Sequence, residues 1–107
     1  MTVSENFIEF VLDQLSQLDG ISTRKMFGGL AIYQYRVIFA LISDDMVYLK
    51  VYKTTIEKYL QADSKPLQPF PNRPAVKSYY EVPVDILEDS EKFTKWVEES
   101  LFAQKEK

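Results

Sequence analysis

The 107-residue sequence contains no cysteine and no histidine. Without cysteine, the chain has no disulfide, no thiolate-bound zinc or iron–sulfur cluster, and no thiol nucleophile. Without histidine, it lacks the commonest general base and the commonest metal ligand. We therefore expect a protein that is not an enzyme and that has no catalytic residue, no metal site and no cofactor.

Long apolar runs and a leader-like start are also missing. No apolar stretch approaches the roughly 20 residues that a membrane helix needs. The first residues show no basic start followed by an apolar run, as a secretion signal would. We therefore expect no membrane partner and a cytoplasmic location.

Positive charge is concentrated in the middle of the sequence. The net charge is −3: residues 1–20 and residues 79–107 each contribute −4, whereas residues 21–78 contribute +5. Nucleic-acid binding derives much of its affinity from neutralising phosphates. Because the acidic ends would repel phosphate, direct nucleic-acid contact is not the leading expectation for this chain.

Apolar periodicity predicts helices near both ends and strands between them. Residues 3–18 repeat apolar positions every three or four residues, with Thr2 and Glu5 as a capping box or, alternatively, Ser4 as the N-cap. Residues 85–103 read as a closing helical region with a cap at Asp85 or Ser90 and a break near 89–90. Clusters of Val, Ile, Tyr and Phe predict strands at 24–33, 37–43, 46–52 and 78–82. A short helix at 54–61 and an irregular, proline-rich connection at 63–76 complete the order.

These elements predict an α+β fold in one domain over residues 1–107. The expected architecture is a two-layer sandwich, with an antiparallel sheet of about four strands flanked by N- and C-terminal helices. The strand at 37–43 is apolar on both faces, which is typical of a strand covered on both sides. The helices are too few to cover both faces, so we expect a homodimer with Val37, Phe39 and Leu41 as the dimer face.

Several stretches carry more local detail than a generic sandwich requires. They are RKMFGG at 24–29, FALI at 39–42, YLKV at 48–51 and YYEVPVDILED at 79–89. In this order and spacing they resemble the N-terminal domain of the TfoX/Sxy family, over about residues 8–101. The glycine pair Gly28-Gly29 lacks the spacing of a phosphate-binding loop, and we expect a bulge or a close approach of another element there.

The resemblance implies a helix–sheet–helix fold and a regulator of natural competence without enzymatic activity. Members of the family act with the cAMP receptor protein at competence-gene promoters, which makes that protein the implied partner. Full-length competence regulators carry a second, C-terminal domain, and we expect a single-domain member. The sequence also departs from the family pattern at Arg36, where a turn glycine is frequent, and at Tyr52, where an aspartate is frequent.

Basic and aromatic residues alternate through the predicted strands and mark a candidate interaction surface. Its members are Arg24, Lys25, Tyr33, Arg36, Tyr48, Lys50, Tyr52 and Lys53. Such a surface can stack bases and hold phosphates, dock acidic helices of another protein, or protect a solvated sheet edge. In the segment Tyr79–Pro83 we expect an edge strand with one tyrosine directed inward.

The sequence thus favours a non-enzymatic protein-interaction module of the TfoX/Sxy type that acts in transcriptional regulation. Two alternatives remain. One is a weak nucleic-acid-binding protein that uses the basic aromatic surface, and the other is a chaperone-like scaffold domain for an acidic partner.

Overall fold

The predicted α+β class is confirmed by the computed structural model, which describes residues 4–26, 28–68, 72 and 74–106. The strands of this part form one open antiparallel sheet in the order β1-β2-β3-β4-β6-β5, so six strands replace the expected four or so. The elements in chain order are α1 (Glu5–Gln14), β1 (Ile21–Met26), β2 (Gly29–Gln34), β3 (Val37–Ser43), β4 (Met46–Lys50), α2 (Ile56–Gln61), β5 (Pro66–Leu67), β6 (Val76–Glu81), α3 (Val84–Leu87) and α4 (Ser90–Glu106).

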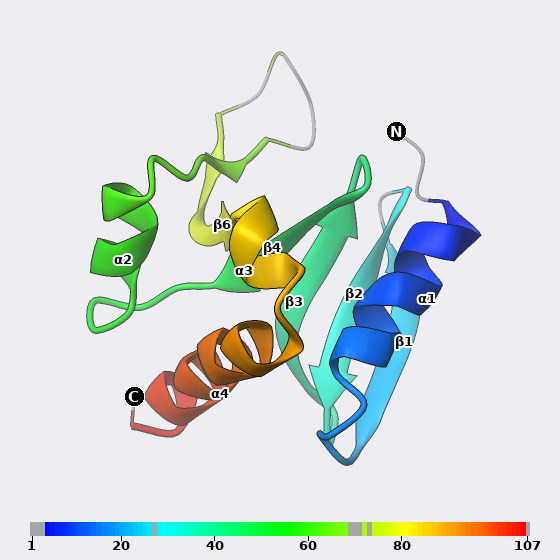
Figure 1. Cartoon of the computed structure of the whole chain (residues 1–107). Coiled ribbons are helices and arrows are strands. Elements are labelled where there is room, and N and C mark those ends of the chain that lie inside the picture. Colours follow the sequence, from blue (N-terminus) through cyan, green and yellow to red (C-terminus); the bar gives the residue numbers. More distant parts are fainter. Residues whose placement is uncertain (1–3, 27, 69–71, 73, 107) are drawn as a thin grey trace.

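The helices α1, α3 and α4 pack over one face of the sheet (Figure 1). The core between the two layers includes Val11 of α1 and Phe93 and Val97 of α4, all fully buried. From the sheet it receives every second residue of the central strands, namely Leu30, Ile32, Ala40, Ile42, Val47 and Leu49. None of the helices in the described residues is long and apolar enough to span a membrane.

The short helix α2 is anchored to this core by one aromatic residue. Tyr59 is fully buried, and its ring meets Trp96 of α4 edge-on, with 4.8 Å between ring centroids. The ring of Tyr80 in β6 lies 6.3 Å away on another side. Tyr59 therefore joins α2, α4 and the sheet.

Helix α1 begins later and ends earlier than the predicted range of 3–18. The alternative cap is the one found, because the Ser4 hydroxyl accepts a hydrogen bond from the Phe7 N–H at 3.2 Å, whereas Thr2 of the predicted capping box lies outside the described residues. At the other end, the Gln14 side chain donates to the Leu87 carbonyl at 2.8 Å, and the Ser90 hydroxyl donates to the Gln14 carbonyl at 3.0 Å. These bonds fix the end of α1 against α3 and α4.

The closing helical region is broken near residue 89, as predicted. Pro83 precedes α3, and the Asp89 side chain accepts a hydrogen bond from the Lys92 N–H at 3.1 Å at the start of α4. The cap is therefore Asp89 rather than Asp85 or Ser90. A carboxylate there also interacts favourably with the positive end of the helix dipole.

The predicted strand at 24–33 is wrong, because the chain turns back within it. Met26 pairs with Gly29, so β1 and β2 form a tight hairpin, and Gly28 adopts a φ of +74° that favours glycine. A Cβ atom on Gly29 would stand 2.3 Å from the Ile42 carbonyl oxygen of β3. The expected close approach of another element at the glycine pair is thus found at Gly29.

A register shift in the β2–β3 pairing changes which residues of β3 share a face. Ile32 pairs with Ala40, but the next residue, Tyr33, pairs with Ile38, so Phe39 is an extra residue in the strand. A bulge of this kind directs two successive side chains to one side. Phe39 and Ala40 are both fully buried in the core, whereas Leu41 turns to the opposite face.

Candidate functional site

The face of the sheet opposite the helices carries the residues that alternate with the core residues. We call it the uncovered face. The pairing registers place on it Arg24 and Met26 of β1, Ala31 and Tyr33 of β2, Ile38 and Leu41 of β3, Tyr48 and Lys50 of β4, and Tyr79 and Glu81 of β6.

An apolar hollow of about 280 Å³ lies on the uncovered face. Its walls include Met26 of β1, Leu41 of β3, and Leu67 and Val76 of the β5–β6 hairpin. β1 and β5 are the two outermost strands of the sheet. Because residues of both strands line the same hollow, the sheet curves into a concave surface here. A half-buried apolar hollow is the usual form of a ligand or docking site.

Tyrosines gather at one end of this hollow. Tyr79 lines it, and burial raises the pKa of the Tyr79 phenol, with further upward contributions from the nearby phenols of Tyr52 and Tyr33. Lys50 pairs with Tyr79 across β4 and β6, and its amine lies 5.8 Å from the centre of the Tyr52 ring. Residues from β2, from β4 with the two residues that follow it, and from β6 therefore place three phenols and one ammonium group close together.

A second set of polar side chains lies two residues along β4 and β6 from Lys50 and Tyr79. Tyr48 pairs with Glu81, and burial raises the pKa of the Tyr48 phenol, helped by the negative charges of Glu81 and Asp44. Burial also raises the pKa of the Glu81 carboxyl, against a lowering effect from the charge of Lys65. The carboxylate of Glu81 therefore lies on the uncovered face with the charge of Lys65 nearby, and Asp44 of the β3–β4 turn also acts on Tyr48.

The structure brings together only part of the predicted interaction surface. Four of its eight members lie on the uncovered face: Arg24, Tyr33, Tyr48 and Lys50. Lys25 pairs with the core residue Leu30 and therefore points to the helix side of the edge strand β1. Arg36 lies in the β2–β3 turn at a φ of +70°, and Tyr52 and Lys53 follow the end of β4.

The expected dimer face is wrong in its composition. Phe39 is fully buried beneath the helices, so it does not share a surface with Leu41. Val37 pairs with Gln34, which in turn pairs with Ile21, so Val37 points to the helix side at the margin of the sheet. Its side chain is 40% exposed. Of the three residues only Leu41 borders the hollow, and its neighbour there is Ile38, which the sequence pattern assigned to the other face.

Tyr79 is not among the residues of the predicted interaction surface. The signal was present in the two-residue period of a strand, because Tyr80 belongs to the core and Tyr79 must then face the other way. No comparable sequence pattern marks Leu67 and Val76 as part of the hollow, because their position there depends on the curvature of the sheet. The strand β6 is also internal, between β4 and β5, rather than the expected edge.

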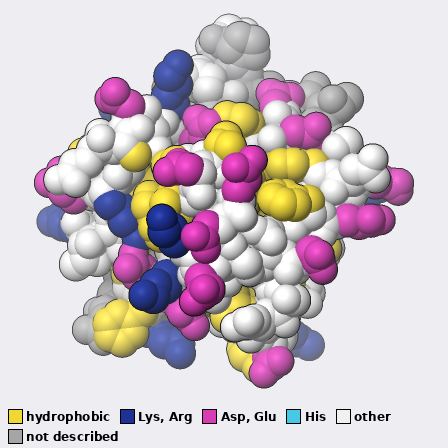
Figure 2. All heavy atoms as spheres, viewed as in Figure 1, with side chains coloured by type: hydrophobic (Ala, Val, Ile, Leu, Met, Phe, Trp, Pro, Cys, Tyr) yellow, Lys and Arg dark blue, Asp and Glu magenta, His cyan; other side chains and the backbone are white. Residues whose placement is uncertain are grey.

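The helix side of the molecule has a different charge. Figure 2 shows acidic side chains spread over this side, and the acids of α1 and α4 include Glu5, Glu9, Asp13, Glu91 and Glu98. The basic residues of the uncovered face thus lie on the opposite side from most of the acidic residues.

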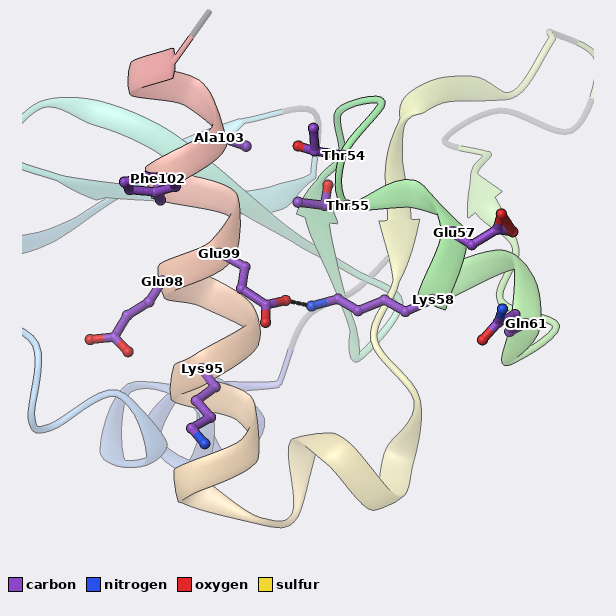
Figure 3. A pocket seen from close by; sticks show the side chains of 10 residues that line it. All are labelled: Thr54, Thr55, Glu57, Lys58, Gln61, Lys95, Glu98, Glu99, Phe102 and Ala103. Carbon is purple, nitrogen blue, oxygen red and sulfur yellow. Dashed lines mark ion pairs between the residues drawn. The ribbon is translucent and has the colours of Figure 1, made fainter.

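A wider cleft of about 910 Å³ separates α2 from α4 (Figure 3). Lys58 reaches across it from α2 and forms an ion pair with Glu99 of α4, and its amine lies 4.3 Å from the centre of the Trp96 ring. Burial lowers the pKa of Lys58 to about 8. The walls also carry Lys95 and Glu98, so the cleft mixes both signs of charge and favours no class of ligand.

Two comparisons with known proteins bear on identity. The family model described as the TfoX N-terminal domain matches residues 13–104. This range includes the whole sheet, α2, α3 and nearly all of α4. A search of curated proteins found no match.

Proposed function

The chain belongs to the TfoX N-terminal domain family, and on that premise we propose that it is a non-enzymatic interaction module acting in transcriptional regulation. Its uncovered face would dock a transcription regulator such as the cAMP receptor protein, as in competence-type co-activation. The chain would act through protein contact, with no sequence reading of its own.

The observation that supports this proposal most is the concave apolar hollow with basic residues around it. Apolar side chains left uncovered over several strands mark a surface that meets a partner. Arg24 and Lys50 flank the apolar residues, whereas the helix side is acidic. A partner with an apolar anchor and acidic neighbours would complement this face.

The test is a fluorescence-anisotropy titration of a labelled promoter duplex, with and without the cAMP receptor protein. We expect no binding by the chain alone and a tighter receptor–DNA complex when the chain is added. Leu41→Asp should abolish this effect, because it puts a charge into the hollow. Val84→Asp is the matched control, since Val84 is 61% exposed on the helix side. An unchanged receptor–DNA affinity would count against the proposal, provided that circular dichroism shows a folded chain.

A second candidate function is weak, direct nucleic-acid binding. The observation that favours it is the presence of Arg24, Tyr33, Tyr48 and Lys50 on one face. This function predicts binding of single strands by the chain alone, with affinity that falls steeply as salt rises. Lys50→Glu should then abolish binding.

We also propose that the chain forms a homodimer, with Ile38 and Leu41 at the interface in place of Phe39. Sedimentation of the wild-type chain tests this directly, and Leu41→Asp should shift a dimer to a folded monomer. A wild-type chain that stays monomeric at high concentration would contradict the dimer and leave the face free for another partner.

A further inference from the structure

The hollow on the uncovered face has the size and lining of a small-ligand site. Its wall residues are uncharged, and the polar side chains among them are Ser43 and Tyr79. An apolar cavity of about 150 Å³ holds one benzene molecule. By proportion, about 280 Å³ accommodates an apolar group of roughly ten carbon atoms.

The phenol cluster gives this hollow one polar end. Tyr79 belongs to both, and Tyr33 and Tyr52 lie close enough for their phenols to raise its pKa. Like any tyrosine phenol, that of Tyr79 is protonated near neutral pH, so it can donate a hydrogen bond. Lys50 contributes an ammonium group next to these donors. Several donors and one cation at a half-buried position favour an anionic group.

The charges around the cluster are consistent with an anion at that end. The carboxylate that shares the face, Glu81, acts on Tyr48 and has Lys65 beside it. The causes of the Tyr79 pKa shift are burial and the two neighbouring phenols, and they include no carboxylate. Glu81 lies two residues from Tyr79 on the same face, and the positive charge of Lys65 acts on its carboxylate.

We propose that the uncovered face binds a small amphipathic anion of the monocarboxylate class. Its apolar body, of about ten carbons, fills the hollow beside Leu41 and Val76. Its carboxylate accepts a hydrogen bond from Tyr79 and pairs with Lys50. One anionic position at one end of a hollow fits a single carboxylate better than the row of phosphates in a nucleic-acid strand. The ligand would occupy the same hollow as the proposed protein partner, but its binding is measured on the chain alone, so the two proposals can fail separately.

Three ligands that share a ten-carbon tail and differ in head-group charge test the proposal: decanoate, 1-decanol and decylammonium. Isothermal titration calorimetry measures their affinities, and backbone amide NMR locates them. We expect decanoate to saturate one site per chain and to bind at least tenfold more tightly than 1-decanol, with decylammonium weakest. The shifted amides should lie in β2, β3 and β6.

Two variants separate the anion contact from the apolar contact. Lys50→Gln should weaken decanoate about tenfold, the usual effect of losing one charge-assisted hydrogen bond, and leave 1-decanol unchanged. Tyr79→Phe should act in the same direction with a smaller effect. Lys92→Gln, which changes an exposed lysine of α4, is the matched control and should change neither affinity.

Three results would overturn the proposal. The first is equal binding of decanoate and 1-decanol, and the second is an unchanged decanoate affinity in Lys50→Gln. The third is an oligonucleotide such as a ten-residue oligothymidylate that binds this face more tightly than decanoate. That third outcome would assign the phenols and Lys50 to the nucleic-acid function instead.

Discussion

The two faces of the sheet are built from the same strands but are used differently. On the helix side, the core residues of β2, β3 and β4 are aliphatic or aromatic and buried beneath the helices. On the uncovered face, the alternating residues include three tyrosines, an arginine and a lysine beside an apolar hollow. The helix side therefore provides stability, whereas the polar groups of the uncovered face stay partly accessible to solvent.

The largest contrast in stability is expected between two residues of β3, Phe39 and Leu41. Phe39→Ala empties a fully buried position and should lower the free energy of unfolding by about 3–5 kcal/mol. Leu41→Ala, on the uncovered face, should cost less than about 2 kcal/mol, since only part of its surface is buried. Urea denaturation followed by circular dichroism measures both, and equal losses would show that the uncovered face is also packed, for example in a dimer.

The same two residues show what the sequence could and could not predict. The density of Val, Ile and Phe in residues 37–43 correctly predicted a strand that is apolar on both faces. Strict alternation then assigned Phe39 and Leu41 to one face, and this was wrong because the bulge inserts one residue. A bulge depends on the partner strand and on packing, so the strand's own pattern does not reveal it.

The curvature of the sheet likewise made part of the site unpredictable from the sequence. Arg24, Tyr33, Tyr48 and Lys50 were predictable from composition and two-residue spacing alone. The hollow was not predictable, because its wall at Leu67 and Val76 comes from a hairpin within a proline-rich stretch that read as irregular. Local patterns identify the strands of a site, and long-range geometry decides which segments face one another.

The second-largest effect on stability is expected where β2 and β3 approach closely, since these two strands contribute side chains to both faces. Gly29→Ala places a methyl group 2.3 Å from the Ile42 carbonyl oxygen, which is backbone and cannot rotate away. The strands must separate, and we expect a loss of about 1–3 kcal/mol in the free energy of unfolding, as for an overpacked core. Chemical denaturation tests this, and a neutral result would mean that β2 and β3 can shift at no cost.

The third effect compares buried phenols on the two sides of the sheet. Burial raises the pKa of Tyr59 far above its usual range on the helix side, and raises that of Tyr79 on the uncovered face. The folded chain then binds more protons than the unfolded chain above pH 10, so stability falls as the pH rises through that range. Denaturation midpoints at pH 9 and pH 11 measure the loss. Tyr59→Phe should reduce the loss more than Tyr79→Phe, and the reverse order would mean that the uncovered face is the more buried of the two.

The smallest effect on stability is expected at two adjacent residues of β1 that point to opposite faces. Arg24 lies on the uncovered face and Lys25 on the helix side, and both are exposed. Arg24→Gln and Lys25→Gln should each change the free energy of unfolding by less than about 0.5 kcal/mol, as exposed substitutions usually do. Only Arg24→Gln should weaken binding of an acidic protein partner, because only Arg24 borders the concave surface. If both variants weaken binding equally, the partner uses the exposed edge of β1 rather than one face, and the contrast between the two faces no longer explains recognition.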